Sequence, residues 1–439
     1  MGFLVTPLLA ECVPKKNRGL VVALGGLFSG VALTGGAMAQ GACAEFNVGG
    51  LNQGWRVGAY LGAGWGLIAL ILVFVFYHPG RRPNPQQLST KARFFMIDWV
   101  GLFLGTAGLI IFLVGIDSGS NPYPWNSARI IAMIVVGAIL LIVFALWEWK
   151  GAKFGLFPRA VFQHRNFAIG LAAYFIEGMV INSATAYLSQ INLSLFTTNQ
   201  LLSLVRSLQL GLGAMVGSGI AAFSLGIWRD ARWTLVGAMI MSTLGCGLMA
   251  LLQPHMNYAA FFFPVALIGV SIGIVGTVVP VVVSLCTPNE FIATAISLST
   301  SARGLGGSIG IVITSQVFTS KIKVKLPLEA ATAVAEAGLP LTSIPQLLED
   351  ALGGMPQLIP MVPGITPAVI EALSKAAAQA YADSWRFVWY VLLPFNGVVL
   401  LLVFLLKSTK AQMTKEVASP VLEIHNHHHH DDEKIAMDA

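Results

Sequence analysis

One acidic residue lies in the middle of a long apolar stretch of this sequence, where a carboxylate is chemically conspicuous. Glu177 lies within the apolar run 167–188, close to Tyr174 and Asn182. A charge in the core of a bilayer is unfavourable by a few kcal/mol, so a carboxylate there faces the interior of a helix bundle or a wet cavity. Two interpretations are open. Glu177 could bind a proton or a polar substrate, or it could be a structural carboxylate hydrogen-bonded to a neighbouring helix.

A guanidinium lies in a second apolar run. Arg303 is in the middle of the run 293–318 and is followed by Gly304. It could neutralise Glu177 or bind an anionic group. Alternatively, its long side chain could extend to the cytoplasmic membrane surface and keep its charge in water.

Further polar side chains within the apolar runs could line a cavity together with these charges. Uncharged polar residues inside a membrane more often join helices than contact a ligand. We nevertheless predict a substrate- or proton-binding site drawn from the polar residues of these runs, namely Tyr174, Glu177, Asn182, Gln209, Arg303 and Gln316.

The sequence carries no pattern of an ATP-driven pump or of a metal site. It has no Gly-x-x-x-x-Gly-Lys-Ser/Thr phosphate-binding loop and no His-Glu-x-x-His pair. Its four cysteines (Cys12, Cys43, Cys246 and Cys286) lack metal-ligand spacing. We therefore predict that the protein is not an enzyme, binds no metal and needs no cofactor.

The candidate residues must be positioned by helices that cross a membrane. The 439-residue chain is 56% hydrophobic and 10% charged, whereas a soluble domain is about 25% charged. A spanning helix needs roughly 20 largely apolar residues, and we expect the short apolar segment Gly2–Leu9 to be the end of a helix whose beginning is missing. We predict an all-α polytopic membrane protein with ten spans, near 19–43, 55–77, 98–116, 129–148, 167–188, 201–226, 233–252, 259–285, 293–318 and 385–406.

The basic residues predict which side of the membrane each connector faces. Lys and Arg gather in alternate connectors, and none lies in the opposite connectors 44–54, 117–128, 189–200 and 253–258. Because cytoplasmic loops are enriched in Lys and Arg, we predict a cytoplasmic C-terminus. The net charge of +6 therefore reflects membrane orientation and not a nucleic-acid partner. The long connector 319–384 is expected to form short extracytoplasmic surface helices broken by proline.

Two stretches share one layout, which indicates an internal repeat. In each, a Cys-x-Pro sequence precedes a Gly-rich run, and a Trp-Arg pair opens a later span. Trp55-Arg56 and Trp385-Arg386 are expected at the outer interface, where indoles anchor well. Internal repeats are typical of secondary transporters, and small residues let helices approach closely. We predict that two Gly-rich helices pivot on each other through Gly30, Gly35, Gly36, Gly304, Gly306 and Gly307.

These motifs and their order resemble the major facilitator superfamily, specifically its fourteen-span drug:proton antiporter branch and the fungal trichothecene and siderophore-type efflux pumps. The resemblance covers almost all of residues 1–407, as family helices five to fourteen. Two family motifs are incomplete, because Gly30 to Gly36 lacks a proline and Gly226 to Arg232 matches only weakly. The resemblance rests on Glu11-Cys-Val-Pro-Lys-Lys-Asn-Arg18, Asp98-Trp-Val-Gly101, Tyr123-Pro-Trp125, Leu156-Phe-Pro158 with Arg165-Asn-Phe167, and Ala302-Arg-Gly-Leu-Gly-Gly307.

The resemblance implies a two-bundle helical transporter whose first bundle is incomplete because family helices one to four are absent. The implied parts are a partial N-terminal bundle (1–77), a cytoplasmic linker (78–97), an inserted helix pair (98–148), a C-terminal six-helix bundle (167–406) with the extracytoplasmic loop 319–384, and a disordered cytoplasmic tail (407–439).

The function implied by the resemblance is proton-coupled efflux of a toxin, drug or siderophore. Its partners would be the lipid bilayer, a small-molecule substrate and protons, at the plasma membrane or at a vacuolar or other organellar membrane. Two other interpretations are open: a multi-helix channel or receptor, and a truncated fragment that does not transport.

Overall fold

The computed structural model describes residues 13–50, 53–76, 90–95, 97–119, 123–151, 155–157, 161–288, 291–352 and 362–413. The predicted helix end at Gly2–Leu9, Cys12, most of the linker 78–97 and the tail beyond residue 413 lie outside these ranges. The helices are α2 (Arg18–Glu45), α3 (Gly54–Phe76), α4 (Thr90–Phe95), α5 (Trp99–Asp117), α6 (Ala128–Leu146), α7 (Arg165–Leu195), α8 (Gln200–Ser207), α9 (Gln209–Trp228), α10 (Ala231–Met249), α11 (Ala259–Cys286), α12 (Ile292–Glu336), α13 (Ile344–Leu352) and α14 (Pro367–Phe404).

The protein is an all-α, multi-pass membrane protein. Within the described ranges, nine helical stretches are long and apolar enough to cross a membrane. Eight of these stretches correspond to α2, α3, α5, α6, α7, α11, α12 and α14, and the ninth joins α8 to α9. The remaining predicted span, 233–252, forms α10, which has 19 residues and is not among the nine. It nevertheless packs against α11 and α14 within the bundle.

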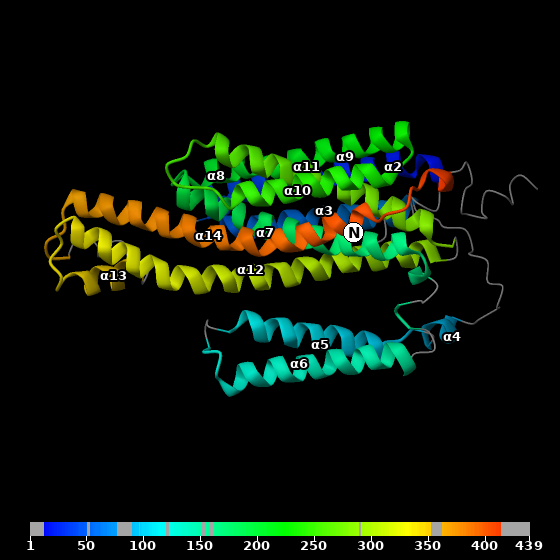
Figure 1. The fold of residues 1–439 in the computed structure, drawn as a ribbon, viewed down its shortest axis with the longest axis horizontal. Coiled ribbons are helices and arrows are strands. Elements are labelled where there is room, and N and C mark those ends of the chain that lie inside the picture. Colours follow the sequence, from blue (N-terminus) through cyan, green and yellow to red (C-terminus); the bar gives the residue numbers. More distant parts are fainter. Residues whose placement is uncertain are drawn as a thin grey trace, which may run out of the picture.

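Six helices pack around one apolar core: α7, α9, α10, α11, α12 and α14. Helix α2 packs against α9 and α11 at the edge of this bundle, and α3 packs against α2. Helices α5 and α6 form an antiparallel pair that lies along α12 (Figure 1). Asp98 caps α5 by accepting a hydrogen bond from the backbone N–H of Gly101 at 2.9 Å.

Helices α12 and α14 extend far beyond the bundle. With 45 and 38 residues, they are about 67 and 57 Å long, whereas the hydrocarbon core of a bilayer is about 30 Å thick. Figure 1 shows α13 at the far end of the hairpin that they form. There, Val334, Leu339, Leu347, Val362 and Val369 make a small core of their own.

This hairpin corrects the prediction for the connector 319–384. Short helices broken by proline were expected, but within the described residues only α13 fits that description. Pro327 lies inside α12, which continues to Glu336. A proline removes one backbone hydrogen bond, and packing of the extended helices on each other offsets that loss. The contact includes an ion pair of Lys325 with Asp383 at 3.0 Å.

Candidate functional site

Small residues bring α7 and α12 into backbone contact. A Cβ on Gly178 would lie 2.0 Å from the carbonyl oxygen of Arg303, and a Cβ on Gly306 would lie 1.9 Å from that of Phe175. Both distances are far below van der Waals contact, so only glycine fits at either position. Close approach of this kind is how helices associate in lipid, where burial of apolar surface gives little driving force.

The two charged residues singled out in the sequence meet at this crossing. The Arg303 guanidinium binds the Glu177 carboxylate in bidentate fashion, with Nε–Oε2 and Nη2–Oε1 distances of 2.5 and 2.6 Å. The Glu177 side chain is 3% exposed and that of Arg303 is 27% exposed. Of the alternatives left open, the structure therefore has Arg303 as the countercharge of Glu177.

Tyr174 completes this group of residues. The Arg303 guanidinium lies over the Tyr174 ring, 5.0 Å from its centroid, in the geometry of a cation–π contact. Tyr174 itself is buried. The bidentate bond and the ring fix the guanidinium on two sides, and its partial exposure leaves it accessible on another.

The other three predicted site residues lie in different places. Asn182 belongs to the same helix crossing: its Nδ2 donates to the Gly178 carbonyl at 3.0 Å, and it lies against Gly307. Gln209 accepts a hydrogen bond from the Tyr258 hydroxyl at 3.4 Å. Gln316 donates to the carbonyl of Asp117 at 2.6 Å, which ties α12 to α5. The structure thus groups Tyr174, Glu177, Asn182 and Arg303, and places Gln209 and Gln316 elsewhere.

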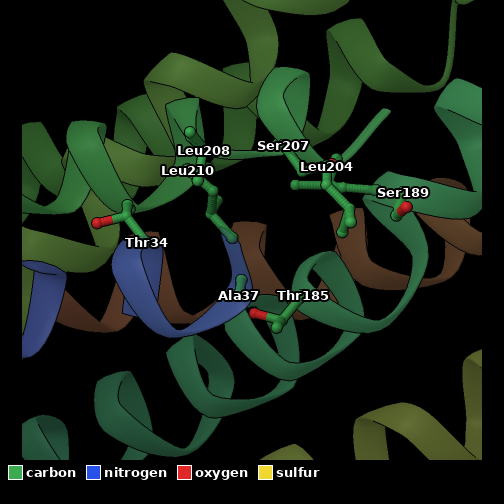
Figure 2. A pocket seen from close by; sticks show the side chains of 10 residues that line it. Thr34, Ala37, Thr185, Ser189, Leu204, Ser207, Leu208 and Leu210 are labelled. Atoms are coloured by element: carbon green, nitrogen blue, oxygen red, sulfur yellow. The ribbon is translucent and has the colours of Figure 1, made fainter. Parts of the chain in front are cut away.

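A small cavity of about 100 Å³ lies between α2 and the helices α7, α8 and α9. Figure 2 shows leucine side chains and hydroxyl-bearing residues around it. Thr185 lines the cavity and lies eight residues beyond Glu177 on α7, about 12 Å along the helix axis. The cavity and the ion pair therefore share a helix but are separate places. Its lining is Thr34, Ala37, Thr185, Leu188, Ser189, Leu204, Ser207, Leu208, Leu210 and Gly211.

The hydroxyl groups of the cavity are all engaged. Ser189 Oγ of α7 lies 3.1 Å from Ser203 Oγ of α8, and the other three donate within their own helices. Thr185 Oγ1 donates to the Ile181 carbonyl at 2.7 Å, Ser207 Oγ to the Ser203 carbonyl at 2.9 Å, and Thr34 Oγ1 to the Gly30 carbonyl at 2.9 Å. No charged residue lines the cavity. Sequence reasoning missed these residues because Ser, Thr and Leu carry no distinctive signal, and the cavity exists only where α2 meets three distant helices.

The Gly-rich helices have different partners from those expected. Helix α2 packs against α9 and α12 packs against α7, whereas the sequence suggested that α2 and α12 would pack on each other. Gly30 contacts α9, because a Cβ there would lie 2.3 Å from Met215 Cγ. Gly35, Gly36 and Gly304 have open space around the Cβ position, with nothing within 4 Å. Close packing therefore accounts for half of the predicted glycines: Gly30, Gly306 and Gly307.

The second Trp-Arg pair is also not where the repeat suggested. Trp55 is 60% exposed, but Trp385 is 3% exposed. The Trp385 ring stacks on Phe318 with centroids 3.8 Å apart, and its Nε1 donates to Ser194 Oγ at 3.3 Å. Because α12 and α14 continue beyond the bundle, this Trp lies inside a helix contact and not at a helix end.

Comparison with known proteins matches this chain to efflux pumps and other membrane transporters. The sequence profile of the fungal trichothecene efflux pump family (TRI12) matches residues 36–434. A trichothecene efflux pump of Fusarium sporotrichioides is 26% identical over 386 residues, which covers 86% of this chain and 64% of that protein. The MFS-type transporter olcL of Penicillium canescens is 26% identical over 318 residues, covering 72% of this chain and 53% of olcL.

Among solved structures, a bacterial homologue of the human lysosomal transporter Spinster, inward-facing and occupied, aligns with a TM-score of 0.42 and 14% identity. The alignment covers 91% of this chain and 88% of that chain. This chain spans 53% and 64% of the lengths of the two curated relatives described above.

Proposed function

The chain belongs to the fungal trichothecene efflux pump family, as its sequence motifs suggested, and we propose that it acts as a secondary active transporter that exports small amphipathic molecules in exchange for protons. The observation that carries this proposal is the buried ion pair of Glu177 and Arg303 at the α7–α12 crossing. Charged groups inside a membrane are costly and mark ion pathways and substrate sites more often than structural contacts.

Protonation of Glu177 is the proposed coupling step. A bidentate contact with Arg303 needs both carboxylate oxygens as acceptors. A proton on one oxygen turns it into a donor facing the guanidinium, which weakens the contact and frees Arg303 for water or for a polar group of the solute. Gly178 and Gly306 allow the backbones of α7 and α12 to touch beside the ion pair. A change in the Glu177–Arg303 contact would therefore change the packing of these two helices.

The cavity between α2 and α7–α9 is the proposed place for part of the solute. Its leucines and engaged hydroxyls suit an uncharged apolar body. Rocking of α2 and α3 against the other bundle would open this space to one side or the other, as in transporters whose site lies between two helical units. Gly30 of α2 and Gly211 of α9 make the close contact on which such rocking would turn.

The proposed setting is the plasma membrane, or a vacuolar or other organellar membrane, with the C-terminus in the cytoplasm. The distribution of Lys and Arg supports this orientation. The proposed partners are the lipid bilayer, a small-molecule substrate such as a toxin, drug or siderophore, and protons. The named relatives that pump trichothecenes make sesquiterpenoid toxins the first solutes to test.

The test is export from an efflux-deficient yeast strain that expresses the whole chain. Accumulation of a fluorescent dye and of a sesquiterpenoid toxin is followed with and without a protonophore. We expect protonophore-sensitive export that Glu177→Gln abolishes. The matched control is Glu371→Gln, because Glu371 is an exposed glutamate paired with Lys375 on the surface of α14.

Three results would contradict the proposal. Absence of export by a well-expressed, membrane-inserted chain would show that this chain does not transport by itself. Export that ignores the protonophore would exclude proton coupling. An ion current without solute export would favour a channel.

A further inference from the structure

The chain does not leave the bundle where α14 ends. Residues 405–413, here called the strap, cross the end of the bundle opposite α13, and Figure 1 shows this segment in red. Within the strap, Lys410–Gln412 form a single turn of 3-10 helix. Leu406 and Thr409 are 1% and 0% exposed, so the strap is packed into the bundle and does not simply lie on its surface.

Helix α7 holds one part of the strap. Asn166 bonds the backbone of Lys407 twice: its Nδ2 donates to the Lys407 carbonyl at 3.0 Å, and its Oδ1 accepts from the Lys407 N–H at 2.9 Å. The Arg165 guanidinium donates to the carbonyl of Leu405. One amide side chain therefore satisfies both polar groups of a strap residue, as a neighbouring β-strand would.

The turn between α9 and α10 holds the middle of the strap through Asp230. Its Oδ2 accepts a hydrogen bond from Ser408 Oγ at 2.8 Å, and its Oδ1 accepts from the Thr409 N–H at 3.4 Å. In return, Thr409 Oγ1 accepts from the backbone N–H of Ala231 at 3.1 Å. Asp230 also caps α10 by accepting from the Arg232 N–H at 3.1 Å. A single carboxylate thus joins the strap to the start of a bundle helix.

The end of the strap covers a thiol at the end of α11. Gln412 Oε1 lies 3.6 Å from Cys286 Sγ, and Cys286 is 4% exposed. The strap therefore ties together the same ends of α7, α10 and α11. Helices that part during transport would have to carry the strap with them or detach it.

Ser408 differs from its neighbour in one respect. Its side chain is exposed, whereas Thr409 is completely buried. The Ser408 hydroxyl is therefore accessible from solution although it bonds Asp230. We propose that Ser408 is a phosphorylation site and that a phosphate on its oxygen detaches the strap from the bundle. This inference rests on the cytoplasmic orientation proposed above, but not on efflux itself.

The proposed reaction is phosphoryl transfer from ATP by a cytoplasmic protein kinase. Ser408 Oγ attacks the γ-phosphorus, and a new O–P bond forms as the bond to the β,γ-bridging oxygen breaks. ADP leaves, and the hydroxyl proton passes to the general base of the kinase. The product carries a charge of about −2 where a hydroxyl donated 2.8 Å from the Asp230 carboxylate. The hydrogen bond from Ser408 to Asp230 is thereby replaced by repulsion between the phosphate and the carboxylate, which drives the strap away from Asp230.

The structure contains its own reporter of this movement. In a chain whose other cysteines are replaced by alanine, modification of Cys286 by a thiol reagent measures how often Gln412 uncovers it. Because the rate of such labelling follows the population of the open form, we expect Ser408→Glu to raise it about tenfold. Ser374→Glu is the matched control, since Ser374 is an exposed serine on the distant part of α14. If Cys286 were labelled at the same rate in the Ser408→Glu variant as in the chain with Ser408 unchanged, the proposed release of the strap would be overturned.

A charge exchange tests whether Asp230 is the partner. Asp230→Lys alone removes the anion that Ser408→Glu is meant to repel. We expect Ser408→Glu to speed Cys286 labelling in the native background but to slow it, or leave it unchanged, in the Asp230→Lys background. An equal acceleration in both backgrounds would show that Asp230 is not the group that expels the strap.

The modification is tested directly on the full chain in membranes whose cytoplasmic face is exposed to cytosolic extract and ATP. We expect mass spectrometry to find phosphate on Ser408 and none on the buried Thr409. Cys286 labelling should rise in the phosphorylated fraction. Two results would overturn the proposal: Ser408 without phosphate, or phosphorylated protein in which Cys286 stays protected because the phosphate binds Arg165 or Arg232 in place. Neither readout depends on transport, so failure of efflux is a separate result.

Discussion

Gly178 on α7 lies against the carbonyl of Arg303 on α12, so closely that a Cβ on the glycine would lie 2.0 Å from the carbonyl oxygen. The backbone that carries the buried guanidinium is therefore fixed by a residue directly adjacent to Glu177 in the sequence. Helix packing and charge pairing at this crossing are one arrangement, and a change in either must affect the other.

Adding one methyl group at this contact should separate the two helices. We expect Gly178→Ala to destabilise the protein by about 3 kcal/mol, at the upper end for overpacking, because backbone cannot move aside as a side chain can. Thermal unfolding in detergent measures the effect. Gly304→Ala is the control, since nothing lies within 4 Å of that Cβ position. A harmless Gly178→Ala would contradict the close contact.

Removing either charge should have unequal effects. Arg303→Leu leaves a carboxylate that is 3% exposed without its partner, which should cost about 3 kcal/mol. Glu177→Leu leaves the more exposed guanidinium and should cost less. The double variant should recover part of the loss, as measured in a double-mutant cycle of thermal stability.

The Arg303→Leu variant should also gain stability as the pH falls. Its defect is an unpaired negative charge, and protonation removes that charge from the folded protein. Thermal unfolding of this variant and of the double variant at several pH values provides the measurement. The double variant lacks the carboxylate and should not share the gain. A parallel response of the two would show that Glu177 is not the titrating group.

Filling the cavity between α2 and α7–α9 should affect solute handling more than stability. Ala37 lines the cavity, and Ala37→Phe places a ring where the solute is proposed to lie. We expect a several-fold rise in the KM for export of a bulky toxin, with a similar amount of folded protein. Ala39→Phe is the control, because Ala39 is an exposed alanine on α2 outside the cavity. Unchanged export kinetics in Ala37→Phe would exclude the cavity as a solute site.

The two Trp residues of the internal repeat should respond differently to truncation. Trp385→Ala removes a buried ring that stacks on Phe318 and should cost about 3–5 kcal/mol. Trp55→Ala removes a ring that is 60% exposed and should cost far less. Thermal unfolding of the two variants gives the comparison, and equal losses would contradict the buried position of Trp385.

The sequence was sufficient to predict those features that are determined by a single large free-energy cost in the membrane. Glu177 and Arg303 stood out because a charge in an apolar run must be paired, and the structure pairs them. The spans followed from the length of helix that a bilayer requires. The family followed from the order of short motifs, each weak by itself, and the profile match confirms it.

The sequence failed where the outcome depends on contacts between distant segments. The predicted span ended at residue 318 and was followed by a connector of short helices, but α12 continues to Glu336 since the helix has a partner in α14. Gln209 and Gln316 could not be placed because their partners, Tyr258 just before α11 and Asp117 at the end of α5, are distant in the sequence. The strap was missed for the same reason: Asp230 and Ser408 are 178 positions apart.

The continuity of α12 makes it a lever arm. A single helix runs from Arg303 to Glu336, a distance of about 50 Å at 1.5 Å per residue. A tilt of about 5° at the ion pair would carry the far end of this arm by about 4 Å. A small tilt of α12 at Glu177, the proposed proton-binding residue, would thus produce a larger displacement at the α13 end of the helix. A fluorescent probe on α13 could report this displacement, and a protein that binds the α13 end could prevent it.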